Sequence, residues 1–188
     1  MDAGISRLFS MKLRLIRFFV SKSRYLKIHV IMKAAGIREI KAELKERSPQ
    51  ELLEICLKLT RFKKENKELL TYLLFEEEDE DSFIIGVKEE MDTAFAAINK
   101  RSYYLMKKGV RKILKETKKY IRYSKKKPTE VELILHFCKK TKLLDPSGRN
   151  VFIQNICERN LIAVKKKIAT LHEDLQFDYE DAVAELEE

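Results

Sequence analysis

The sequence predicts an all-α protein of about seven helices in antiparallel hairpins, arranged as an α-solenoid-like stack or a compact bundle. The 188 residues include only five glycines and three prolines, whereas folds rich in strands or loops need turn residues at about every tenth position. From Ile37 onward, apolar residues recur at the spacing of one helix face. With 45% hydrophobic and 37% charged residues, the chain has material for a core and a polar surface.

The first 33 residues differ in charge from the rest of the chain. They carry eight Lys or Arg and one acid, Asp2, a net charge of +7 against +9 for the whole chain. A basic, weakly amphipathic lead can bind a membrane surface or act as a transit-like segment. The other interpretation is translated upstream sequence before a true start at Met32. We therefore expect a lead over residues 1–33, either poorly ordered or not native, and one helical domain over residues 34–188.

Two or three helices are expected before the acidic run. The first is "IREIKAELKE". In "SPQELLEICLKLTRF", Ser48, Pro49 and Glu51 form a capping box with proline at the first helical position. At "ENKELLTYLLF", with Asn66 as a candidate cap, the chain either continues that helix or opens a new one. The inward residues expected here are Ile37, Ile40, Leu44, Leu52, Ile55, Cys56, Leu59, Leu69, Leu70, Leu73 and Leu74.

Residues 76–81, "EEEDED", are consecutive acids that repel one another, so we expect a solvated acidic loop. Ser82 is the candidate cap of the following helix, "FIIGVKEEMDTAFAAINK", whose apolar residues form one stripe. Its expected inward residues are Ile84, Val87, Met91, Ala94, Phe95 and Ile98.

The most informative stretch is residues 103–127, "YYLMKKGVRKILKETKKYIRYSKKK", which holds eleven Lys or Arg and one acid, Glu116. On an ideal helix beginning near Ser102, the apolar residues fall within an arc of about 120° and the bases within another of about 140°. The bases therefore form one face of an amphipathic helix, and two flanking tyrosines could stack on nucleic-acid bases. The candidate polyanion-binding residues are Lys107, Lys108, Arg111, Lys112, Lys115, Lys118, Lys119, Arg122, Lys125, Tyr104 and Tyr123.

The remaining residues predict a turn and further helices. Pro128 is expected to end the basic segment, because the residue before proline avoids helical geometry. The next helix starts at Pro128 or Thr129, with Thr129 and Glu132 as a capping box. After a turn at "DPSG", residues 149–175 form a long helix with His172 late in it, and the acidic end is a short helix or a fraying tail. The expected inward residues are Val131, Ile134, Leu135, Cys138, Ile153, Ile156, Cys157, Leu161, Val164, Ile168 and Leu171.

A weak self-similarity links two of these helices. The segments "PQELLEICL" and "PTEVELILHF" both open with proline followed by acids. This suggests stacked helical hairpins, and the architecture resembles that of HEAT-like proteins. Two copies leave a compact bundle open as the alternative, and a resemblance of architecture implies no function.

The basic face needs an explanation, because like charges at i and i+4 destabilise a helix by about 0.2–0.5 kcal/mol per pair. One explanation lies within the chain, since residues 76–92 and 173–188 each carry a net charge of −8, against +12 for residues 100–127. The other is an external polyanion, either a nucleic-acid backbone or an acidic protein. We favour a face that is solvated or paired internally.

No catalytic or metal-binding constellation is evident, so we expect no enzymatic activity, metal or cofactor. The sequence contains no P-loop, GxGxxG or GxSxG motif. His136 and Cys138 are two positions apart and so point to different faces of a helix. Cys56, Cys138 and Cys157 form no CxxC pair, and we interpret them as small buried residues in a reduced compartment.

Function is expected to rest on binding. No apolar run reaches the roughly 18 residues of a membrane-spanning helix, and no secretory signal is evident, so the expected location is the cytoplasm. The favoured hypothesis is a non-enzymatic helical interaction module that binds another protein through a groove between helices. The alternative is a nucleic-acid-associated protein with its basic helix on phosphate backbones. Contact of residues 1–33 with a membrane surface is the least favoured option.

Overall fold

The computed structural model describes residues 33–187 and confirms an all-α fold. These residues form eight α-helices and one short π-helix, with no strand among them. The lead predicted over residues 1–33 lies outside the described residues, apart from Lys33. The elements are α2 (Ile37–Lys45), α3 (Pro49–Phe62), α4 (Lys64–Thr71), η2 (Tyr72–Glu76), α5 (Glu80–Ala96), α6 (Tyr103–Ser124), α7 (Lys127–Lys142), α8 (Val151–Ile168) and α9 (Glu173–Ala184).

The chain divides into two compact units after Leu52, within α3. The first unit holds α2 and the beginning of α3. The capping box predicted for α3 is present, because the Ser48 N–H donates to Glu51 Oε2 at 2.9 Å and the Glu51 N–H donates to Ser48 Oγ at 3.3 Å. A carboxylate also caps α2, where the Gly36 N–H donates to Glu39 Oε2 at 2.8 Å.

The inward stripe predicted for α3 is not buried. This helix has no buried residue, and Cys56 and Leu59 are exposed. After α3 ends, α4 opens as a new helix with Lys63 as its N-cap. Asn66 is therefore not the cap; its side chain instead donates to the Leu59 carbonyl at 2.9 Å.

The π-helix η2 explains why the predicted leucine stripe stops early. Leu69 is half-buried, but Leu73 and Leu74 are 45% and 63% exposed. A π-turn holds more residues than an α-turn, so the residues that follow rotate away from the apolar face. Tyr72 takes the inward position and is 2% exposed.

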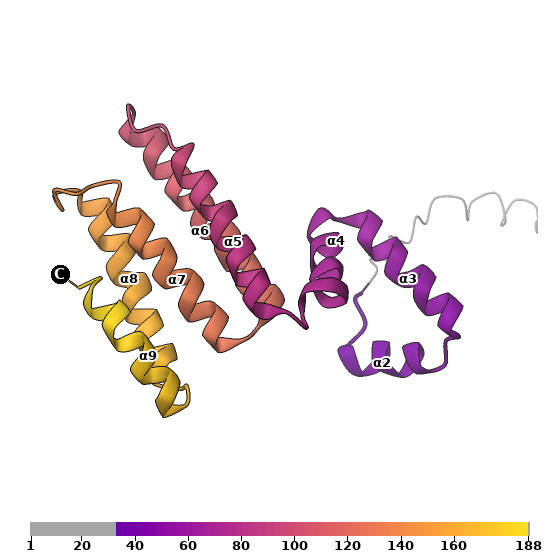
Figure 1. The fold of residues 1–188 in the computed structure, drawn as a ribbon. Helices are drawn as coiled ribbons and strands as arrows, with labels where there is room; N and C mark the ends of the chain where they lie inside the picture. The colour runs from indigo at the N-terminus through magenta and orange to yellow at the C-terminus, as the bar shows by residue number, and fades with distance from the viewer. Residues whose placement is uncertain (1–32, 188) are drawn as a thin grey trace, which may run out of the picture. The chain divides into compact units, whose positions relative to one another are not determined.

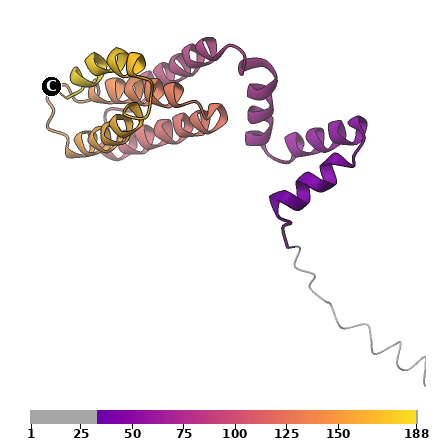
Figure 2. The same cartoon turned by 90° about the horizontal axis from the view of Figure 1, so that it is seen from below.

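Helices α5 to α9 pack as antiparallel neighbours (Figures 1 and 2). α5 and α6 form one hairpin, α7 and α8 form another, and α9 packs against α8. α7 contacts α5, α6 and α8, and its Val131, Leu133 and Phe137 are completely buried. The inward faces predicted for α5, α7 and α8 are confirmed, since every residue named for them is buried or half-buried. The repeat relation between α3 and α7 stays a prediction.

The predicted acidic loop over residues 76–81 is only partly a loop. Its first residue ends η2, and its last two belong to α5. Asp79 is the N-cap of α5 and accepts a hydrogen bond from the Ser82 N–H at 3.1 Å, so the predicted cap at Ser82 is wrong. A carboxylate at a helix N-terminus is stabilised by the orphan N–H groups there, which offsets the repulsion within the run.

Glu80 is the acid of this run that the structure buries most clearly. Its carboxylate accepts hydrogen bonds from the hydroxyls of Tyr72, Ser124 and Thr129 and lies 2.8 Å from the ammonium of Lys126. Burial acts to raise the pKa of Glu80, but these four donors outweigh it and lower the pKa to about 2. The cluster therefore joins α5 to η2, α6 and α7 through an ionised carboxylate.

This cluster also overturns the capping box predicted for Thr129 and Glu132. α7 begins at Lys127 with Lys126 as its N-cap, and Thr129 lies buried inside the first turn. Glu132 instead pairs with Lys88 on α5, at 2.6 Å.

The C-terminal segment forms a helix, α9, rather than a fraying tail. Val183 and Leu186 near the C-terminus are buried, and they pack into the hydrophobic core shared with α5, α6, α7 and α8. His172 does not lie late in α8, which ends at Ile168; it is the N-cap of α9. The predicted turn at residues 145–148 is confirmed, with the Gly148 N–H bonded to the Asp145 carbonyl at 3.0 Å.

Candidate polyanion-binding face

Helix α6 is held at both ends by its own caps. The helix begins near Ser102, as the sequence predicted, and Ser102 accepts a hydrogen bond from the backbone N–H three residues later, at 3.4 Å. At the other end Lys125 adopts a left-handed conformation, with φ of 57°, and its N–H donates to the Ile121 carbonyl at 2.9 Å. The helix therefore ends at Ser124, before Pro128 is reached, and its 22 residues span about 33 Å.

The solvent side of α6, together with its C-cap Lys125, carries eight of the nine predicted bases. Seven are exposed and Lys107 is half-buried. Among residues 33–187, no carboxylate forms an ion pair with any of the eight. We call this set the basic face. It comprises Lys107, Lys108, Arg111, Lys112, Lys115, Lys118, Arg122 and Lys125.

Lys119, the ninth predicted base, does not belong to this face. It is 8% exposed, and its ammonium lies 2.7 Å from Glu68 on α4 and 2.7 Å from Glu116 on α6. Burial acts to lower the pKa of Lys119, but the two carboxylates outweigh it and raise the pKa above its ordinary value. The ammonium is therefore a charged part of the fold and is not available to a ligand.

The two residues predicted to stack on bases, Tyr104 and Tyr123, differ in their exposure. Tyr104 is 72% exposed near the start of α6. Tyr123 is 8% exposed, and its hydroxyl donates to Glu68 at 3.1 Å, so the prediction that it flanks the face and stacks on bases is wrong. Burial and the neighbouring carboxylate raise the pKa of Tyr123 to about 12.

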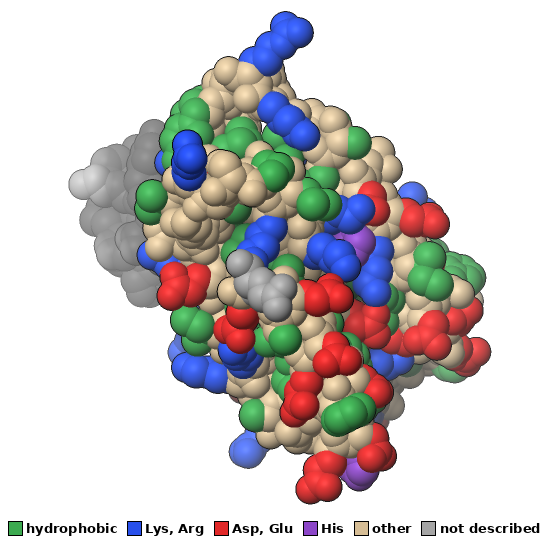
Figure 3. All heavy atoms as spheres, turned by 60° about the vertical axis from the view of Figure 1, so that its left-hand side comes forward, with side chains coloured by type: hydrophobic (Ala, Val, Ile, Leu, Met, Phe, Trp, Pro, Cys, Tyr) green, Lys and Arg blue, Asp and Glu red, His purple; other side chains and the backbone are tan. Residues whose placement is uncertain are grey.

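The sequence favoured a basic face that is either solvated or paired internally, and internal pairing is not found for it in the described part of the chain. The two acidic segments pair instead with bases outside that face, on α7, on α8 and at the start of α7. On the face near the C-terminus, acidic and basic side chains accordingly lie next to one another (Figure 3). The pairs are Glu80–Lys126, Lys140–Asp92, Lys139–Glu185 and Lys165–Glu187.

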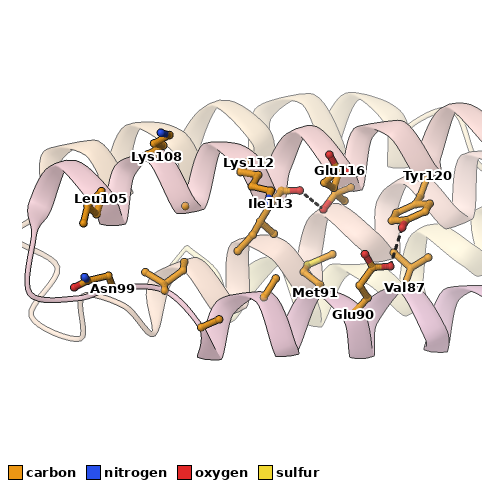
Figure 4. Close-up of a pocket in the computed structure, with 15 residues that line it drawn as sticks. Val87, Glu90, Met91, Asn99, Leu105, Lys108, Lys112, Ile113, Glu116 and Tyr120 are labelled. Atoms are coloured by element: carbon orange, nitrogen blue, oxygen red, sulfur yellow. Dashed lines mark hydrogen bonds between the residues drawn. The ribbon is translucent and has the colours of Figure 1, made fainter. Parts of the chain in front are cut away.

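A groove runs along each side of α6. The α6–α8 groove has a volume of about 650 Å³, and one wall consists of Arg111, Lys115, Lys118 and Arg122. The α5–α6 groove has a volume of about 450 Å³ and is shown in Figure 4. At the α8 end of the basic face, Lys107 and Arg111 lie 5.2 Å and 5.3 Å from the centre of the Phe152 ring.

Comparisons with protein-family models, curated proteins and solved structures find no match to this chain. Between residues 33 and 187, no group of three or more His, Cys, Asp or Glu side chains is arranged to hold a metal ion. None of the helices in the same range is long and apolar enough to cross a membrane. Cys138 and Cys157 are buried as predicted.

Proposed function

We propose that this chain is a non-enzymatic helical interaction module whose basic face binds a polyanion, namely a nucleic-acid backbone. The observation that supports this proposal is a row of eight cationic side chains without an acidic partner in the described residues. Like charges one turn apart repel, so the row carries a cost in stability that a bound polyanion would offset. A row of exposed bases on one face is the electrostatic footprint of a phosphate-binding protein.

The spacing of the bases suits a duplex better than a single strand. Arg111 and Arg122 are eleven positions apart, a length of about 16 Å on a helix. Duplex DNA carries one phosphate per about 3.4 Å of axis on each strand, so this length faces about five phosphates. Single-strand binding relies on aromatic stacking, and of the two stacking residues predicted, only Tyr104 is exposed. We therefore expect binding to be nonspecific in sequence.

Fluorescence anisotropy with a labelled 20-base-pair duplex tests the proposal. About five phosphate contacts predict a slope of about −4 to −5 in a plot of log affinity against log salt concentration, and dissociation constants of about 10⁻⁴–10⁻⁶ M at physiological salt. Replacing the four bases of the α6–α8 groove with glutamine should reduce that slope by about four, since each phosphate contact contributes about one. These replacements are Arg111→Gln, Lys115→Gln, Lys118→Gln and Arg122→Gln.

A control variant loses the same charge elsewhere. Two arginines and two lysines on α2 and α3 are exposed and form no ion pair with a described residue. Their replacement should leave the slope nearly unchanged. No binding by the wild-type protein, or equal losses in both quadruple variants, would count against the proposal. The control replacements are Arg38→Gln, Lys41→Gln, Lys58→Gln and Arg61→Gln.

A protein partner, which the sequence favoured, is the second candidate function. The observation that supports it is the α5–α6 groove, whose lining is mainly apolar. Apolar grooves between helices are common docking sites for peptides. We rank this candidate second because the unpaired bases extend from Lys107 to Lys125, over most of α6, whereas the groove involves one side of it.

A further inference from the structure

The α5–α6 groove has an apolar floor that the fold leaves open to one side. Met91 and Val87 of α5 and Ile113 of α6 form its base, and Leu105, which is 43% exposed, lies at one end (Figure 4). At the same end Gly109 brings α6 close to the α5–α6 connection, since a Cβ there would lie 3.2 Å from Ile98 Cγ1. The groove therefore begins where the hairpin closes and continues along the two helices.

The charged side chains on the rim of this groove differ in whether they have a partner within the protein. Glu90 accepts a hydrogen bond from the Tyr120 hydroxyl at 2.7 Å, and Glu116 pairs with Lys119 at 2.7 Å. Lys108 and Lys112 are exposed and lack an acidic partner in the described residues. The rim is therefore positive at Lys108 and Lys112, two ammonium groups one helical turn apart, and negative at Glu90, whose phenol partner is neutral.

The length of the groove matches a short helix. Leu105 and Tyr120 lie at its ends and are fifteen positions apart, a distance of about 22 Å along α6. A helix of about four turns covers that distance and presents apolar residues at i, i+3 or i+4, i+7 and i+11 to a groove floor. Acids one turn apart on the flank of such a helix would face both lysines of the rim.

We propose that the α5–α6 groove docks an amphipathic helix of a partner protein, with apolar residues on the floor and two or more acids against Lys108 and Lys112. This interaction goes beyond the proposed polyanion binding, because it uses the α5 side of α6 and a protein ligand. Charge argues against the chain's own residues 1–33 as the occupant, since they hold eight bases and one acid. The acidic α9 of a second copy has the right charge, and the test below distinguishes it.

The experiment selects, from a displayed library of 16-residue peptides, those that bind the full chain. The library keeps leucine or alanine at the four floor positions and randomises the rest. We expect the selected sequences to carry Asp or Glu at positions i and i+4 of one flank. A selected peptide should bind with a dissociation constant in the micromolar range, and charge reversal at Lys108 and Lys112 should weaken it about tenfold or more.

Two matched controls isolate the groove from the rest of the helix. Charge reversal at Lys115 and Lys118, on the other side of α6, changes the net charge by the same amount and should weaken peptide binding by less than about threefold. Leu105→Glu should abolish peptide binding, whereas Ile162→Glu, at a site of similar exposure on α8, should leave it unchanged. Circular dichroism and urea unfolding of each variant confirm that it is folded.

The outcomes separate this inference from the proposed function. The quadruple glutamine variant should lose duplex binding and keep peptide binding, and Leu105→Glu should do the reverse. Selected peptides without flanking acids, or equal weakening by both charge reversals, would overturn the docking inference and leave polyanion binding intact. A dimer in sedimentation that Leu105→Glu dissociates would identify a second copy of the chain, rather than a different partner, as the occupant and overturn the proposal.

Discussion

Replacing Lys119 with methionine should destabilise the protein much more than the same replacement of its neighbour Lys118. Lys119 is 8% exposed and bridges Glu68 and Glu116, whereas Lys118 is exposed and unpaired among the described residues. Methionine keeps the unbranched shape and the helix propensity of lysine but removes the charge. The replacement at position 119 therefore leaves the half-buried carboxylate of Glu68 without its closest cation.

The expected magnitude follows from what remains around Glu68. Removing one partner of a buried ion pair costs about 3–5 kcal/mol. The Glu68 side chain is 23% exposed and keeps the Tyr123 hydroxyl at 3.1 Å and the Lys64 ammonium at 3.2 Å. We therefore expect Lys119→Met to lower the free energy of unfolding by about 2–3 kcal/mol and Lys118→Met to change it by less than about 0.5 kcal/mol. The larger loss corresponds to a fall in Tm of about 4–12 °C.

Urea unfolding of the two variants measures the difference, and duplex binding supplies an independent readout. Because Lys119 is not on the basic face, Lys119→Met should leave the salt slope of duplex binding unchanged, whereas Lys118→Met should reduce it by about one. Adding Glu68→Gln to Lys119→Met should cost less than the sum of the two single changes. Equal stabilities of the two methionine variants, or a slope lowered by Lys119→Met, would refute the assignment of Lys119 to the interior.

Three further predictions concern other parts of the fold. Because the pKa of Glu80 is lowered from 4.5 to about 2, its contribution to stability is complete above pH 4.5 and is lost as the pH falls towards 2. The difference in urea stability between the wild type and Glu80→Gln should therefore shrink as the pH falls over that interval. A constant difference would contradict this prediction. Gly86→Ala should stabilise the protein by about 0.5–1 kcal/mol, since the added Cβ meets nothing within 4 Å. Gly109→Ala should gain less, because its Cβ would lie 3.2 Å from Ile98, and an equal gain in thermal unfolding would argue against that contact. Cys56, the exposed cysteine, should be the one thiol that reacts rapidly with an aromatic disulfide reagent before urea is added, and a second fast thiol would contradict the burial of the other two.

The helix faces could be predicted from the sequence because burial repeats along them. The inward positions follow helical spacing over three or more turns in α5 and α8 and over about two turns in α7, so one misplaced residue does not hide the pattern. The same reasoning failed at Leu73 and Leu74, where a π-turn changes the number of residues per turn and shifts the face. No residue type marks such a turn, so periodicity alone could not locate it.

The helix ends were harder to predict because several depend on side chains far away in the sequence. Thr129 has the residue type and spacing of an N-cap, yet its hydroxyl donates to Glu80, which lies 49 positions earlier. Ser82 was displaced as the cap by Asp79, three residues before it, within a run that was expected to be a loop on grounds of repulsion. Local signals name the residues able to cap a helix, but tertiary contacts decide which of them does so.

The candidate site shows the same limit, and it also shows why the basic face remains the best-supported feature for function. On a helical wheel, Lys118 and Lys119 both fall within the basic arc, and no local signal shows that Glu68, 51 positions away, lies against one of them. The net charges suggested that the acidic segments neutralise the basic face. A net charge, however, does not show which bases the acidic side chains contact. In the described residues those acids contact bases on α7, on α8 and at the start of α7. A fold that places its acids beside those bases, and buries the one α6 lysine that has partners, leaves eight positive side chains whose repulsion only a ligand or solvent ions can screen. The salt dependence of duplex binding distinguishes these two, because solvent ions alone give no complex to measure.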